Sequence, residues 1–292
     1  MEKILFKKQL YATDKTFSKI NSRRKASISS EHFLLAFSVV AIFIYFVFLG
    51  MPIAALCRYA GIEKLFAGLN DPAAFKVIET SIKTSAISII FIFLLGTPTV
   101  FFLSSRSGTL LGKILDILVQ LPIVLPPAAA GIGLLLLFGS KGWIGEFLKN
   151  YGIQVAMSTG AVIIAQFFVS SAFYVQILKT AVNRVPKEIF EASYLCGVGK
   201  YEAIVRVILP MLKKEIIAGV LLCWIRAMGE FGATIMFAGN IIGKTRTIPV
   251  HIYMLMQSDV KDAAAFSGIT FFLSFGVLLF TNSFLLKKNE MY

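Results

Sequence analysis

The sequence predicts an all-α membrane protein with six membrane-spanning helices, because of its apolar composition, the lengths of its apolar segments and the positions of its basic residues. Of its 292 residues, 57% are apolar and 15% are charged, and the mean hydropathy is +0.78. Soluble domains carry about 25% charged residues. A chain this apolar belongs in lipid, where a spanning segment has to satisfy its own backbone hydrogen bonds as a helix.

Six apolar segments have the length of a membrane-spanning helix, which needs about 20 residues to cross the hydrocarbon core. They cover residues 33–56, 80–104, 115–139, 158–182, 212–238 and 263–286. The first segment is longer than the apolar part of a signal peptide, which has about 7–15 residues. We therefore expect the first helix to be an uncleaved anchor.

The basic residues predict the orientation of these helices. The net charge is +13, and eight of the 29 Lys and Arg residues lie within residues 1–31. Many of the others follow the second, fourth and sixth spans. Because basic segments stay on the cytoplasmic side, we expect both termini and the loop 183–210 to be cytoplasmic. This alternation favours a role in topology over nucleic-acid binding.

The reactive side chains are few and scattered. Cys57, Cys196 and Cys223 lie in three different regions, and His32 and His251 are the two histidines. These spacings do not suggest a disulfide framework or a metal site. Clustered His or Cys residues and paired intramembrane carboxylates, which mark membrane-embedded enzymes, are missing from the sequence. We expect no cofactor or metal on this chain and no catalytic residue.

The third span contains Pro122, Pro126 and Pro127, followed by residues 128–133, which are all small except Ile132. Proline removes a backbone donor and clashes with the preceding turn, so it breaks or kinks a helix. The freed backbone groups need partners in protein or in a watery cavity. Two interpretations remain open, a helix that lines a pathway or acts as a hinge, and a kinked packing helix.

The loop 183–210 is predicted to form two short helices joined by a turn. Pro186 suits a helix start, and residues 187–195 place Ile189, Phe190 and Tyr194 near one face. Gly197 and Gly199 allow a sharp turn, a second short helix follows, and the loop closes at residue 210. Such a unit fits a groove on a partner protein, and an ordinary amphipathic interfacial loop is the alternative.

Within this loop, one motif resembles a known family. Glu191, Ala192, Ser193 and Gly197, followed by Leu209 and Pro210, resemble the EAA loop of the membrane subunits of bacterial type I ABC importers, with Ser193 at a more common alanine position. The resemblance implies a coupling helix that contacts a separate cytoplasmic ATPase. It implies that Glu191 stabilises either the loop itself or its contact with the ATPase, and that Gly197 supplies the turn.

A relaxed P-loop pattern occurs at residues 238–245, Ala-Gly-Asn-Ile-Ile-Gly-Lys-Thr. A P-loop follows a buried strand and opens a helix in a soluble α/β domain, whereas this segment follows an apolar span and is predicted outside. We therefore expect ATP to bind to a partner ATPase and not to this chain.

The segment 226–240, together with Thr-Arg-Thr-Ile-Pro-Val-His-Ile-Tyr at 245–253, looks like the permease subunit of molybdate and tungstate ABC importers. Sulfate permeases share its Gly-Glu-Phe-Gly core. Arg226 and Glu230 are four residues apart, so we expect their side chains to lie on the same face of a helix. Ionisable residues within a span usually face protein or water. They form either a packing pair or part of a gate. The candidate pathway residues are Arg226, Glu230, Thr234, Pro126 and Pro127.

The resemblance implies a fold, a set of partners and a location. It divides the chain into a cytoplasmic tail (1–31), a first helix with an external loop (32–74), a type I ABC importer transmembrane domain (75–286) and a second cytoplasmic tail (287–292). It implies a multi-pass permease of the cytoplasmic membrane that works as a homodimer with ATPase subunits and an external molybdate-binding protein. Sulfate or tungstate are alternative substrates. An ATPase-independent secondary transporter or channel is the alternative from another class.

Overall fold

The computed structural model describes residues 34–61 and 71–289, and every regular element in these ranges is a helix. The N-terminal helix covers Leu34–Ala60. The other helices are α3 (Pro72–Ser105), α4 (Leu110–Val124), α5 (Pro127–Phe138), α6 (Trp143–Lys149), α7 (Thr159–Asn183), α8 (Lys187–Leu195), α9 (Lys200–Ala203), α10 (Leu209–Met211), α11 (Lys213–Met228), α12 (Gly232–Phe237), α13 (Ile248–Ser258) and α14 (Val260–Asn289), with a π-helical turn at Ile204–Ile208. The all-α prediction is confirmed.

The chain divides into two units, residues 1–59 and 60–292. In the first unit, residues 34–50 of the N-terminal helix are exposed around the whole circumference. Its apolar side chains include Phe43, Phe46 and Phe48. A helix that is apolar all round and not covered by protein suits direct contact with lipid. The predicted tail 1–31 lies outside the described residues.

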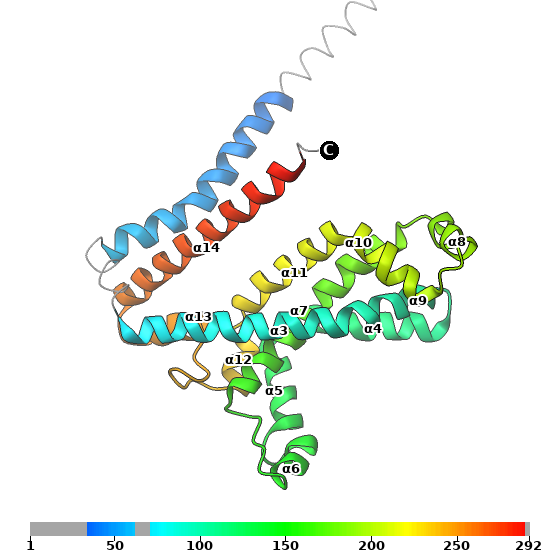
Figure 1. Cartoon of the computed structure of the whole chain (residues 1–292). Coiled ribbons are helices and arrows are strands. Elements are labelled where there is room, and N and C mark those ends of the chain that lie inside the picture. Colours follow the sequence, from blue (N-terminus) through cyan, green and yellow to red (C-terminus); the bar gives the residue numbers. More distant parts are fainter. Residues whose placement is uncertain (1–33, 62–70, 290–292) are drawn as a thin grey trace, which may run out of the picture. The chain divides into compact units, whose positions relative to one another are not determined.

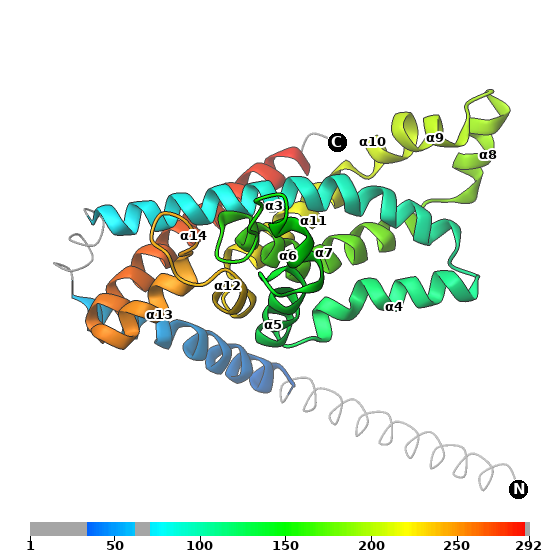
Figure 2. The same ribbon diagram turned by 90° about the horizontal axis from the view of Figure 1, so that it is seen from below.

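The second unit is built around α3, α7 and α11, which pack against one another (Figures 1 and 2). Tyr174 of α7 is fully buried at the centre of this group. A Cβ at Gly96 of α3 or at Gly219 of α11 would lie 2.8 or 3.1 Å from the Tyr174 ring, so small residues on both neighbours make room for it. The Tyr174 hydroxyl forms a 2.8 Å hydrogen bond with Thr97 Oγ1, which satisfies the buried phenol.

The predicted third span is broken. Helices α4 and α5 meet at an angle of 112° on either side of residues 125–126. Pro122 lies inside α4, Pro126 caps α5 and Pro127 is its first residue. Proline is well tolerated at a helix start but not in the interior, so the Pro126-Pro127 pair ends one helix and begins another. Figure 1 shows α5 turning away from the direction of α4.

The predicted fifth span is broken as well, which the sequence analysis did not anticipate. Helix α11 ends at Met228, and α12 begins at Gly232. Arg226 and Glu230 therefore do not share one continuous helical face, and that prediction was wrong. Two glycines flank Glu230 at positions 229 and 232, and glycine weakens a helix interior.

Three described helices are long and apolar enough to cross a membrane, Leu34–Ala60, α3 and α7, and the bent α4–α5 pair makes a fourth if it is one span. Helix α14 is 30 residues long and covers the predicted sixth span. The two segments predicted to be external, 140–157 and 239–262, contain the short helices α6 and α13. The count of six spans and the cytoplasmic location of the ends stay predictions, and residues 290–292 lie outside the described residues.

Candidate functional site

The loop between α7 and α11 has the predicted two-helix form. Helix α8 covers Lys187–Leu195, the predicted segment, with Pro186 directly before it. Ile189 and Phe190 of α8 and Val207 of the π-helical turn pack against the main apolar core of the second unit. These contacts anchor the loop to the body of the protein. Tyr194 lies one helical turn after Phe190 in α8, as predicted, but it is half-exposed.

Gly197 makes the turn after α8. Its φ is +78°, in the left-handed region that side chains other than glycine rarely adopt. The Val198 N–H donates to the Ser193 carbonyl at 3.0 Å, and the Gly197 N–H donates to the Tyr194 carbonyl at 2.9 Å. These two bonds form a Schellman motif, which satisfies the last carbonyls of a helix and reverses the chain. Gly199 does not share this role, because its φ is −65°.

The second half of the loop contains the π-helical turn Ile204–Ile208, followed at once by Leu209 and Pro210. Pro210 cannot donate a backbone hydrogen bond, and its ring crowds the carbonyl four residues earlier. The wider turn before it gives that carbonyl room. Ile208 is fully buried, Leu209 is partly buried and Pro210 is exposed. Leu209 and Pro210 therefore join the loop to α11.

The outer surface of the loop carries large apolar side chains that are highly exposed among charged ones. Leu195 is 90% exposed and Tyr201 is 84% exposed. Glu191 and Ala192 of the motif are exposed too, whereas Ser193 is buried and its hydroxyl donates to the Ile189 carbonyl at 2.8 Å. Aromatic and large apolar side chains at the centre of an exposed surface are the usual anchors of a protein–protein contact. In Figures 1 and 2, α8 lies at the far end of the second unit, beyond the ends of α7 and α4.

The second group of predicted residues lies at the break between α11 and α12. Glu230 is 1% exposed, and its Oε2 accepts a 2.8 Å hydrogen bond from Arg226, which is 30% exposed. The other carboxylate oxygen accepts from the backbone N–H of Ala233 at 2.8 Å. Glu230 therefore joins the last turn of α11 to the first turn of α12. An anion at a helix start also interacts favourably with the helix dipole.

The two broken spans meet close to this ion pair. A Cβ at Gly232 would lie 3.0 Å from the Pro127 side chain, and a Cβ at Gly131 would lie 2.7 Å from the Ala233 backbone. Helices α5 and α12 therefore pack with their backbones almost in contact, as small residues permit in membrane proteins. Pro126 and Pro127 are exposed, whereas Thr234 is fully buried and its Oγ1 has no hydrogen-bond partner among the described residues.

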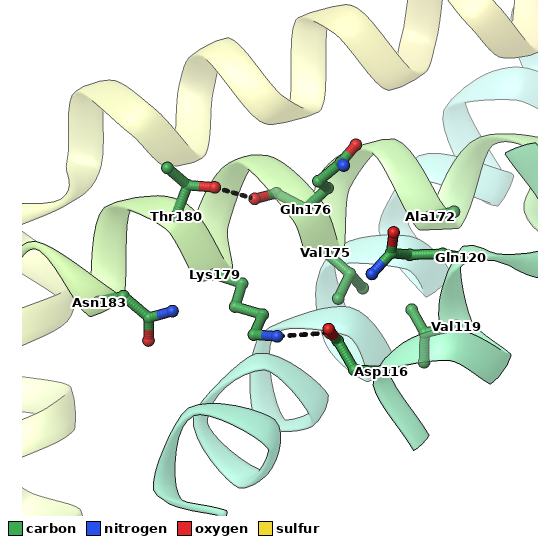
Figure 3. A pocket seen from close by; sticks show the side chains of 9 residues that line it. All are labelled: Asp116, Val119, Gln120, Ala172, Val175, Gln176, Lys179, Thr180 and Asn183. Carbon is green, nitrogen blue, oxygen red and sulfur yellow. Dashed lines mark hydrogen bonds and ion pairs between the residues drawn. The ribbon is translucent and has the colours of Figure 1, made fainter. Parts of the chain in front are cut away.

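One polar cluster was missed by the sequence analysis. Lys179 of α7 forms an ion pair with Asp116 of α4 at 2.5 Å, and both side chains line a cavity of roughly 160 Å³ between these helices (Figure 3). Each residue stands as a lone charge within a predicted span. Asp116 lies near the start of the predicted third span, and Lys179 lies near the end of the predicted fourth span. Charges within a span are costly and are usually paired or functional, which is the signal that points to this pair.

The segment 238–245 does not have the structure of a P-loop. Helix α12 precedes it, and α13 begins three residues after it, at Ile248. Gly239 and Gly243 both have φ of +73°. The Thr245 hydroxyl, which would hold Mg²⁺ in a P-loop, is buried and accepts a hydrogen bond from the Ile241 N–H at 2.9 Å. This segment is a compact turn.

Comparison with known proteins identifies the family. Residues 96–286 match the family described as the binding-protein-dependent transport system inner membrane component. The chain belongs to this family. It is a permease subunit of a type I ABC importer.

Several relatives of the permease share most of its length. It is 54% identical over 236 residues to a protein named as the probable transport system permease protein NifC of Clostridium pasteurianum, covering 81% of this chain and 82% of the relative. It is 37% identical over 221 residues to the molybdenum transport system permease protein ModB of Mycobacterium bovis, covering 76% of this chain and 83% of the relative. It is 31% identical over 256 residues to the sulfate transport system permease protein CysT of Synechocystis, covering 84% of this chain and 86% of the relative.

A solved structure shares the fold of the permease. A chain of a bacterial ABC transporter involved in the import of alginate superposes with a TM-score of 0.71 at 17% identity, over 90% of the permease and 98% of that chain. At this identity the likeness concerns the fold alone. It agrees with the all-α architecture and with the position of the family match.

The native cysteines allow a direct test of the loop's location. A variant that keeps only exposed Cys196, with Cys57→Ser and Cys223→Ser, is expected to resist an impermeant thiol reagent in intact cells and to react in inside-out vesicles. Cys223 is buried and its thiol donates to the Ser170 carbonyl at 3.1 Å, so serine keeps that bond. Glu146→Cys, on exposed α6, is the external control. A Gly145 replacement is unsuitable, because a Cβ there would clash with the Gly139 carbonyl. Labelling of Cys196 from outside would overturn the predicted orientation.

Proposed function

We propose that the permease forms the path by which molybdate crosses the cytoplasmic membrane, as a homodimer driven by separate ATPase subunits and supplied by an external molybdate-binding protein. The observation that carries this proposal is the 37% identity to a molybdenum permease over 76% of the chain. That similarity agrees with the resemblance of residues 226–240 and 245–253 to molybdate and tungstate permeases.

In this proposal the exposed loop converts ATPase movement into opening and closing of the path. Leu195 and Tyr201 enter a groove on the ATPase, and the Gly197 turn holds α8 at a fixed angle to the rest of the loop. Ile189 and Phe190 transmit the displacement to the core that holds α3, α7 and α11 together. ATP binds and is hydrolysed on the partner chain, so this chain needs no catalytic residue or cofactor of its own.

The paired breaks near Arg226 and Glu230 are the proposed moving part of the path. Two short helices, α5 and α12, are joined to longer ones by breaks and pack closely on each other. Short segments connected by breaks can change angle without unfolding either helix. Glu230 neutralises Arg226 in the described conformation, so an oxyanion would be attracted weakly and released readily.

Sulfate and tungstate are the competing substrates within this class, because a sulfate permease matches the chain over a similar length. The test is accumulation of molybdenum and sulfur in cells that lack their own molybdate and sulfate importers and express this permease with its ATPase and binding protein. We expect molybdate uptake that excess sulfate does not suppress. Sulfate uptake without molybdate uptake would contradict the proposed substrate. Uptake that persists when the phosphate-binding lysine of the ATPase is replaced would contradict ATP-driven transport.

A further inference from the structure

The cavity between α4 and α7 has the chemistry of an anion-binding site. Its polar lining comes from Asp116 and Gln120 of α4 and from Gln176, Lys179, Thr180 and Asn183 of α7 (Figure 3). Its amide and ammonium groups can donate hydrogen bonds, whereas the Thr180 hydroxyl already donates to the Gln176 carbonyl at 2.8 Å. Its volume of roughly 160 Å³ compares with the protein cavities of about 150 Å³ that accept a benzene molecule, so one small oxyanion fits.

The charges in this cavity are balanced rather than net positive. Lys179 is 19% exposed and Asp116 is 29% exposed, and one N–H of the ammonium group is used on the carboxylate. An ammonium group has three donors, so the pairing leaves others for a second acceptor. A cation that is already neutralised attracts an anion less strongly than a free one does, as the Coulomb energy of the opposing carboxylate offsets that of the ammonium.

The cavity is also next to the loop that is proposed to receive the ATPase. Asn183 is the last residue of α7, and α8 begins four residues later at Lys187. Lys179 is one helical turn before Asn183, and α4 packs directly on α7 in this region. A displacement of α8 therefore acts on the helix end that carries Lys179.

We propose that this cavity is a transit site for the transported oxyanion, in which Lys179 contacts the anion and Asp116 limits how tightly it is held. The inference rests on the proposed import of an oxyanion. In the described conformation Asp116 and Lys179 are paired across this cavity. When the two helices separate, the Lys179 ammonium group releases Asp116 and donates its hydrogen bonds to the anion. When the ion pair forms again, the anion is released.

Three variants separate this role from simple helix packing. Asp116→Asn frees the Lys179 charge, and we expect about tenfold lower molybdate uptake together with more molybdenum retained by the purified permease–ATPase complex after washing, since a hydrogen bond to a charged group contributes about 1.5–3 kcal/mol. Lys179→Gln removes the cation, and we expect low uptake without retention. The double variant Asp116→Asn/Lys179→Gln restores a neutral, hydrogen-bonded pair of similar volume, and we expect normal amounts of folded protein with uptake still about tenfold low.

The exposed pair Glu79–Lys83 on α3 provides the matched control, because it has the same charges at 2.5 Å. Glu79→Gln/Lys83→Gln is expected to leave uptake unchanged. Wild-type uptake in the Asp116→Asn/Lys179→Gln variant would overturn the inference, as would unchanged molybdenum retention in Asp116→Asn. A rise in co-purifying phospholipid phosphate, without bound molybdenum, would also overturn it in favour of a lipid headgroup site. If the wild-type protein transports no oxyanion at all, the proposed function fails instead.

Discussion

Gly197→Val is expected to lower molybdate uptake strongly while the permease still accumulates in the membrane. A β-branched side chain at φ of +78° forces a conformation that costs about 1–3 kcal/mol, and the loop can relieve this strain by changing the Schellman turn. The angle between α8 and the rest of the loop then changes, and the surface formed by Leu195 and Tyr201 no longer fits the ATPase. We expect uptake to fall by about tenfold or more, measured as cellular molybdenum.

Gly199→Val is the matched control for this variant. Its backbone is extended and a Cβ there would meet no atom within 4 Å, so we expect uptake close to wild type. Gly197→Asn should restore part of the activity, because asparagine tolerates the left-handed region better than other residues do. Normal uptake in Gly197→Val, at normal protein levels, would show that the turn is not needed for coupling.

Arg226→Leu and Glu230→Leu are each expected to lower the amount of folded permease strongly. Removal of one partner leaves the other charge buried and unpaired, which costs about 3–5 kcal/mol for a buried pair. Glu230 is the more buried partner, so Arg226→Leu should be the more damaging change. Glu230→Leu additionally leaves the Ala233 N–H without its acceptor. Thermal melting and size-exclusion profiles in detergent measure both effects.

The double variant Arg226→Leu/Glu230→Leu separates a packing pair from a gate. If the pair mainly fixes the α11–α12 break, the double variant should recover much of the folded protein and some uptake, although the Ala233 N–H stays unsatisfied. Lys83→Leu on α3, which removes one partner of an exposed pair, should change stability by less than about 1 kcal/mol. Wild-type levels of folded protein in both Arg226→Leu and Glu230→Leu would refute the buried-pair interpretation.

Local signals made the loop predictable. The bounds of α8 follow from Pro186 before it and Gly197 after it, and the turn needs positive φ, which favours glycine. The exposure of Tyr194 could not be predicted in the same way, because it depends on the position of the loop against the core, and helical spacing alone does not determine that position.

Tertiary features were harder to predict. The prolines of the third span predicted a break or kink, but its 112° angle depends on the packing of α5 against α12. The break at residues 229–231 was missed because residues 212–238 were treated as one apolar span, although Gly229 and Gly232 around a charged residue were a usable signal. The Asp116–Lys179 pair joins residues 63 positions apart, and only the presence of opposite lone charges in two spans pointed to it.

We propose that the exposed end of the 183–210 loop receives the ATPase. The most direct measurement is photo-crosslinking from a reactive amino acid placed at Leu195, which is 90% exposed, with the same group at Trp143, which is 89% exposed on α6, as the control. Our account predicts a crosslink to the ATPase subunit from residue 195 and none from residue 143. A crosslink to the ATPase from residue 143, or none from residue 195 in a complex that transports molybdate, would contradict it.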